Sequence, residues 1–205
     1  MDQKEIMHYW YYFCSLCSQL NDTRQYVDHS TVDKSGITVL ANGDTYSNEF
    51  LKILLSSSSE FETVGKLLCK SIDKDFKGKS NIVLISETIL SKYPNIVKTK
   101  IATDYEDLVP LSEWKIVDNA NKKVEGLGWW RAYTDIKHAR YENFKSATLK
   151  NCIDALGSLL VFELYLSMDA TGSVSNLSAY GCDYFSFEYG VEHFYVKGLQ
   201  DLPDF

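Results

Sequence analysis

The chain has 205 residues, of which 45% are hydrophobic and 24% are charged, and it carries a formal net charge of −7. This composition is typical of a globular protein with one substantial core. The acidic balance argues against a broad surface that coats nucleic acid, although it leaves room for a small basic site. Only three prolines occur, which favours long helices over an all-β chain.

The sequence shows no run of about 18 apolar residues, so we predict no membrane span. Residues 1–5 are polar and of mixed charge, which does not resemble a secretory signal. The five cysteines form no dense framework, and an odd number is typical of reduced thiols. We therefore expect a cytoplasmic protein.

Apolar residues recur at helical spacing over residues 4–27, which predicts a first helix. Turn residues in 28–45 indicate a loop or small hairpin, with a short strand at 38–40. A second helix is predicted over about 47–72, where Ser47 is a suitable N-cap. A third helix covers about 81–93 and stops before Pro94.

Residues 95–127 read as irregular, with a short strand at 115–117. A fourth helix begins near Gly128, and a fifth, over 144–168, has a wide apolar face. Residues 184–189 alternate as a strand does. The fold class is therefore mainly α: an up-down bundle of about five helices with short β or irregular insertions. The bundle covers residues 1–168, and residues 169–205 form a tail packed on the same domain.

The fourth helix carries the strongest functional signal. Arg131 and His138 are seven positions apart, so they share one helix face about 10 Å apart along the axis, with Asp135 between them. A permanent cation, an imidazole that titrates near neutral pH and a carboxylate that can orient it are parts of a phosphate-handling site. The alternative is an ordinary exposed face with an Arg131–Asp135 ion pair.

Local charge favours the functional interpretation. Residues 131–150 hold five basic and two acidic side chains within an otherwise acidic chain, as a focused phosphate site requires. Aromatic residues are interleaved with these charges and are able to stack on bases. Burial statistics nevertheless favour a core position for Trp129 and Trp130.

Other signals are weak. Cys14 and Cys17 form a C-x-x-C inside an amphipathic helix, where buried thiols are a better interpretation than a metal site. His8, His29 and His193 have no nearby partners in sequence that suggest chemistry. No P-loop, dinucleotide or zinc-protease signature occurs. We therefore expect no metal and no cofactor.

Residues 130–144, just after the start of the predicted fourth helix, have the pattern W-x-x-Y-x-x-I-K-H-x-R-x-x-N-F. This pattern is also seen in uncharacterised bacterial proteins. With the arginine–six residues–histidine spacing in a helical bundle, it resembles the HEPN superfamily, whose motif is an arginine followed by four to six residues and a histidine. The positions that carry this resemblance are Trp130, Arg131, Tyr133, Ile136, Lys137, His138, Arg140, Asn143 and Phe144.

The resemblance implies a metal-independent endoribonuclease, often a homodimer whose two motifs line one cleft, in a bacterial defence or toxin–antitoxin system. His138 would be the general acid/base and Arg131 the phosphate contact, with Lys137 or Arg140 as alternative cations. The expected partners are RNA and an antitoxin or other protein. The remaining site predictions are Asp135 as the group that orients His138, and Lys137, Arg140, Tyr133 and Asn143 as substrate contacts.

Two other functions stay open at this point. A HEPN-like bundle that has lost the chemistry would bind RNA or a protein partner without cleaving, because a fold does not fix function. A purely structural oligomerisation domain, with the aromatic tail as its interface, is a weaker alternative.

Overall fold

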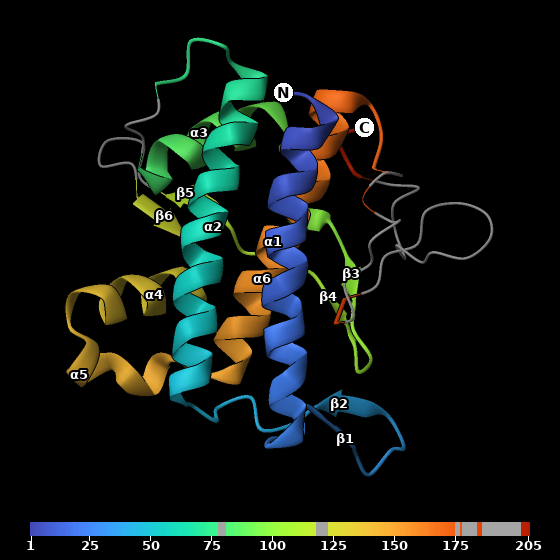
Figure 1. Cartoon of the computed structure of the whole chain (residues 1–205), viewed down its shortest axis with the longest axis vertical. Helices are drawn as coiled ribbons and strands as arrows, with labels where there is room; N and C mark the ends of the chain where they lie inside the picture. Colours follow the sequence, from blue (N-terminus) through green and yellow to red (C-terminus); the bar gives the residue numbers. More distant parts are fainter. Residues whose placement is uncertain (78–80, 118–122, 175–176, 178–183, 186–201) are drawn as a thin grey trace.

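The computed structural model describes residues 1–77, 81–117, 123–174, 177, 184–185 and 202–205. Three long helices lie side by side at its centre: α1 (Gln3–Asp22), α2 (Asn48–Ile72) and α6 (Leu149–Thr171) (Figure 1). Helix α2 runs antiparallel to α1, and α6 runs parallel to α2. The rings of Phe61 and Phe162 stack with centroids 4.0 Å apart between α2 and α6. The predicted mainly helical bundle with short β insertions is confirmed.

The shorter elements lie around these helices. The part of the chain that the structure describes contains three two-stranded antiparallel pairs: β1 (Ser30–Val32) with β2 (Thr38–Leu40), β3 (Ile101–Ala102) with β4 (Asp107–Leu108), and β5 (Lys115–Val117) with β6 (Lys123–Glu125). The shorter helices are α3 (Ile82–Lys92), α4 (Gly128–His138) and α5 (Arg140–Asn143). Single 3₁₀ turns cover Thr23–Gln25, Ile96–Lys98 and Phe144–Ser146.

Helix α6 forms the centre of the core. Nearly every side chain from Leu149 to Ser167 is buried, because α1, α2 and α4 pack around it. By length and composition, α6 is also apolar enough to cross a membrane, although the sequence has no unbroken run of about 18 apolar residues there. Inside the fold, 83% of its most apolar window is buried. The core helix of a folded domain meets the same criterion.

The predicted start of the last long helix, at residue 144, is wrong. Residues 144–146 form a 3₁₀ turn, and α6 begins after Thr148, whose hydroxyl oxygen accepts a hydrogen bond from the Asn151 amide at 3.2 Å. The loop before α2 supplies the reason. The amides of Leu149 and Lys150 donate to the carbonyl oxygens of Thr45 and Gly43, both at 2.9 Å. These contacts satisfy first-turn amides that lack partners in any helix start.

Thr148→Ala is expected to lower the free energy of unfolding by about 1 kcal/mol, because it removes the side chain that caps α6. Urea unfolding followed by circular dichroism measures this change. Ser18→Ala, on the exposed side of α1, is the matched control and should change stability by less than about 0.5 kcal/mol. Equal effects of the two substitutions would contradict the assigned cap.

Other element boundaries also differ from the predicted ones. Helix α1 ends at Asp22 rather than residue 27, and a 3₁₀ turn follows it. Residues 95–127 contain two β hairpins where the sequence suggested one short strand. Strands at 38–40 and 115–117 and the third helix are confirmed. Of the predicted strand at 184–189, residues 186–189 lie outside the described residues; Tyr184, Phe185 and Leu202 of the tail are buried in the same core as the helices.

Candidate active site on helix α4

Helix α4 presents two different faces. Trp129, Ala132, Tyr133 and Ile136 are buried, and the Trp129 ring packs edge-on against Phe61 with centroids 4.9 Å apart. Trp129 is therefore a core residue, as predicted, and Trp130 is half-buried beside it. Because the apolar face is held against α2 and α6, the opposite face is fixed outward.

That outward face carries the predicted catalytic pair. Arg131, Asp135 and His138 are all exposed, and 87% of the Arg131 side chain is accessible. Arg131 Nε lies 3.7 Å from Asp135 Oδ2, so Asp135 contacts the arginine. Among the described residues, no hydrogen bond joins Asp135 to His138. The predicted orienting role of Asp135 toward His138 is thus not seen in this arrangement.

A sharp corner follows His138. Ala139 leaves the helical region with φ −143° and ψ 69°, which ends α4, and α5 begins at Arg140. The Asn143 side-chain amide donates to the carbonyl oxygens of Asp135, at 3.2 Å, and Ala139, at 2.9 Å. Asn143, predicted as a substrate contact, therefore holds the corner that places the exposed Arg140 just beyond His138.

The surroundings of Tyr133 and Lys137 also differ from those expected of two substrate contacts. Tyr133 is only 7% exposed, so its ring is not an open platform for a base. Lys137 Nζ lies 3.4 Å from the Tyr133 hydroxyl oxygen and 5.4 Å from the centre of its ring. Tyr133 thus positions the exposed Lys137, which remains available as a cation beside His138.

A groove of about 760 Å³ lies beside the N-terminal half of α4 and the β5–β6 hairpin. Arg131 and Asp135 line it, together with Glu113, Lys123, Val124, Glu125, Gly126, Leu127, Gly128, Trp130 and Thr134. His138 does not line the groove and lies at the exposed end of the helix. The two motif residues therefore share an open face but not this groove.

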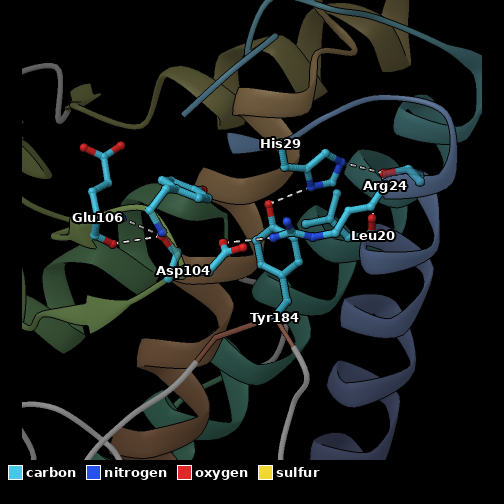
Figure 2. Close-up of polar contacts among 9 residues, drawn as sticks. Leu20, Arg24, His29, Asp104, Glu106 and Tyr184 are labelled. Atoms are coloured by element: carbon cyan, nitrogen blue, oxygen red, sulfur yellow. Dashed lines mark hydrogen bonds and ion pairs between the residues drawn. The ribbon is translucent and has the colours of Figure 1, made fainter. Parts of the chain in front are cut away.

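Sequence reasoning missed a polar cluster centred on His29. His29 is 1% exposed; its Nε2 lies 2.9 Å from Thr23 Oγ1 and its Nδ1 lies 2.9 Å from the Tyr184 hydroxyl oxygen (Figure 2). Arg24 lies 4.9 Å from the Tyr184 ring centre and bonds to Asp104 at 2.9 Å. No local sequence pattern indicates this cluster, because Tyr184 is 155 positions away from His29.

The hydrogen bonds define the state of His29. The Thr23 hydroxyl donates its proton to the Leu20 carbonyl oxygen at 2.6 Å, so His29 Nε2–H donates to Thr23. Burial, and secondarily the Arg24 cation, lower the pKa of His29 to about 4. The ring is therefore neutral at pH 7, and its Nδ1 accepts a hydrogen bond from Tyr184. The cluster therefore holds the end of α1, the β3–β4 turn and the tail together.

Tyr184→Phe is expected to lower the free energy of unfolding by about 1 kcal/mol, because it removes the donor to His29 while keeping the ring. Urea unfolding measures the change. Tyr141→Phe is the matched control, since Tyr141 is 94% exposed. Unchanged stability in Tyr184→Phe would show that the hydrogen bond does not hold the tail.

Cys17 is buried, as the sequence interpretation expected, and Cys14 is half-buried. The described residues contain no group of three His, Cys, Asp or Glu side chains that could hold a metal ion.

Comparisons with protein-family models, curated proteins and solved structures gave no match for this chain.

Proposed function

We propose that this protein is a HEPN-like, metal-independent endoribonuclease of a bacterial defence or toxin–antitoxin system, acting in the cytoplasm. His138 is the general acid/base and Arg131 contacts the phosphate. The observation that carries the proposal is the outward face of α4, where Arg131 and His138 stand exposed on a helix whose other face is fixed in the core. Sites on rigid elements hold their geometry better than sites on loops.

The chemistry needs few groups. A base removes the proton of a ribose 2′-hydroxyl, the 2′-oxygen attacks phosphorus, and the bond to the 5′-oxygen breaks as an acid protonates that leaving oxygen. A cation stabilises the charge that develops on the phosphorane. Arg131 supplies the cation and His138 one proton transfer. The His138 of a second copy supplies the other, so the proposal includes a homodimer with both α4 faces in one cleft.

The surroundings of His138 support binding to an anionic substrate. Lys137 precedes it, Arg140 follows it, and both side chains are exposed. The Asn143 hydrogen bonds fix the corner that brings Arg140 to this end of the helix. In a chain with a net charge of −7, this basic face directs a phosphate toward one place.

The end groups of the RNA products test this proposal directly. Purified protein incubated with a mixed RNA pool in EDTA should yield 5′-hydroxyl ends and 2′,3′-cyclic phosphates, because the 2′-oxygen is the nucleophile and no metal is required. Products with 5′-phosphates, or cleavage only when divalent metal is restored, would contradict the mechanism.

One observation favours the non-catalytic alternative. Arg131 is ion-paired with Asp135, and no described side chain orients His138. If wild-type protein binds RNA in the EDTA experiment but cleaves none, alone or with a protein partner such as an antitoxin, the bundle is a binding module. The acidic remainder of the surface then suits docking of a basic partner.

A further inference from the structure

We propose that the groove beside α4 binds a guanine base of single-stranded RNA, with Glu113 as the residue that recognises it. This inference rests on the proposed function, because it assumes that RNA lies across the α4 face. It goes further in naming the nucleotide next to the scissile phosphate and the side chain that selects it.

The charges in the groove disfavour a phosphate inside it. Three acidic residues line it, Glu113, Glu125 and Asp135, against two basic ones, Lys123 and Arg131. Lys123 Nζ binds Glu125 at 2.9 Å, and Arg131 pairs with Asp135. Among the described residues, Glu113 has no ion-pair partner. The groove therefore offers a free acceptor and suits a ligand edge that carries N–H donors.

Guanine fits this acceptor best among the four bases. Its Watson–Crick edge carries two adjacent donors, N1–H and the N2 amino group, which match the two oxygens of one carboxylate. Adenine, cytosine and uracil each place an acceptor beside their single donor group on that edge. Unstacked bases of single-stranded RNA are commonly recognised through this edge.

Trp130 provides a surface on which the base can stack. Its half-buried ring lines the groove and is held by Tyr133, with centroids 5.1 Å apart, and by Trp129, at 5.8 Å and nearly perpendicular. A ring fixed in this way loses little entropy when a base stacks on it. Stacking on an aromatic side chain is available to every base, so Trp130 adds affinity and leaves the choice of base to Glu113.

The backbone places Glu113 beside the start of α4. Gly126 has φ +88°, and a Cβ built there would lie 1.8 Å from the Glu113 carbonyl oxygen. The link from β6 into α4 therefore lies directly against residue 113, which only glycine permits. As a result, Glu113, Trp130 and Arg131 line one groove, with Arg131 exposed at its edge to hold the neighbouring phosphate.

Binding of uncleavable RNA tests the groove separately from catalysis. We would titrate the full-length protein into labelled 2′-O-methyl pentamers of uridine whose central base is G, A, C or U, and follow fluorescence anisotropy. Wild type should bind the G pentamer about tenfold more tightly than the others, since a bidentate base contact discriminates by roughly that factor or more. In Glu113→Gln the preference should fall to about twofold or less.

Glu106→Gln is the control, because it removes a carboxylate from an exposed residue in the β3–β4 turn that does not line the groove, and it should keep the tenfold preference. Equal binding of the four pentamers by wild type, no binding of any, or a G preference that survives Glu113→Gln would overturn the proposal. None of these results bears on cleavage. Conversely, a G preference without any RNA cleavage would support guanine binding in the groove and contradict the nuclease assignment.

Discussion

His138→Ala should lower the rate of RNA cleavage by about 10²–10⁴-fold, the range that general acid–base catalysis typically supplies. The side chain is exposed and lies at the end of α4, so its removal should leave the unfolding midpoint unchanged. Initial rates on an RNA pool in EDTA measure the effect. His8→Ala, an exposed histidine on α1, should cleave at the wild-type rate. Full activity of His138→Ala would contradict the assignment of His138 as the general acid/base.

Substitutions of Arg131, Arg140 and Lys137 identify which of these cations contacts the phosphate. Arg131→Ala breaks an exposed ion pair with Asp135 at 3.7 Å, which costs less than about 1 kcal/mol of stability, so a large loss of activity would report on catalysis. Arg131→Lys should recover part of the rate, because it keeps the charge but not the fork of donors. If Arg131→Ala retains activity and Arg140→Ala or Lys137→Ala loses it, the phosphate contact is the arginine or lysine whose removal abolishes cleavage.

Glu163→Gln is expected to raise the free energy of unfolding at pH 7, because the wild-type chain must release the Glu163 proton on unfolding to reach its lowest free energy, which favours the unfolded state, and the glutamine has no such proton. Glu163 is on α6 with no exposed surface, and neither carboxyl oxygen has a hydrogen-bond partner among the described residues. Burial, with a smaller contribution from Glu60, holds the pKa of Glu163 well above its usual value of 4.5. The folded protein therefore keeps this acid protonated at a pH where the unfolded chain ionises it.

The sign of the pH dependence follows from that difference. Above about pH 4.5, the unfolded state releases the Glu163 proton and the native state does not, so wild type loses about 1.4 kcal/mol of stability for each pH unit up to the native pKa. Glu163→Gln lacks this loss. Urea unfolding of both proteins at pH 4, 5.5 and 7 should give curves that separate as the pH rises.

Two further variants sharpen this test. Glu163→Leu also removes the buried polar atoms and should be at least as stable as Glu163→Gln at pH 7. Glu142→Gln, at an exposed position on α5, is the control and should follow wild type at each pH. A Glu163→Gln protein less stable than wild type at pH 7 would show that the carboxylate is ionised and paired in the folded state.

Local patterns in the sequence predicted most of the helices. The stripe through Trp10 and Leu20, the cap at Ser47 and the stop before Pro94 each depend on residues within a few positions of one another, and the structure has helices there. Helical spacing also predicted that Arg131, Asp135 and His138 would share one face. Such features need only the period of the helix and the chemistry of its ends.

Other features depended on partners far along the chain. The start of α6 moved to Leu149 because the loop at residues 43–45 accepts its first amide protons. Tyr133 and Asn143 have polar side chains that sequence alone favours as substrate contacts, but packing buries the first, and the second bonds to backbone oxygens.

The sequence by itself determined the helical class, the central apolar helix and the exposed motif on α4, because each follows from local periodicity. Only the tertiary structure decided that His29 meets Tyr184, that Glu163 is buried with no hydrogen-bond partner among the described residues, and that Glu113 lies beside the start of α4. The two contacts join residues 155 and 13 positions apart, and their energies come from burial and from hydrogen bonds that no local pattern encodes.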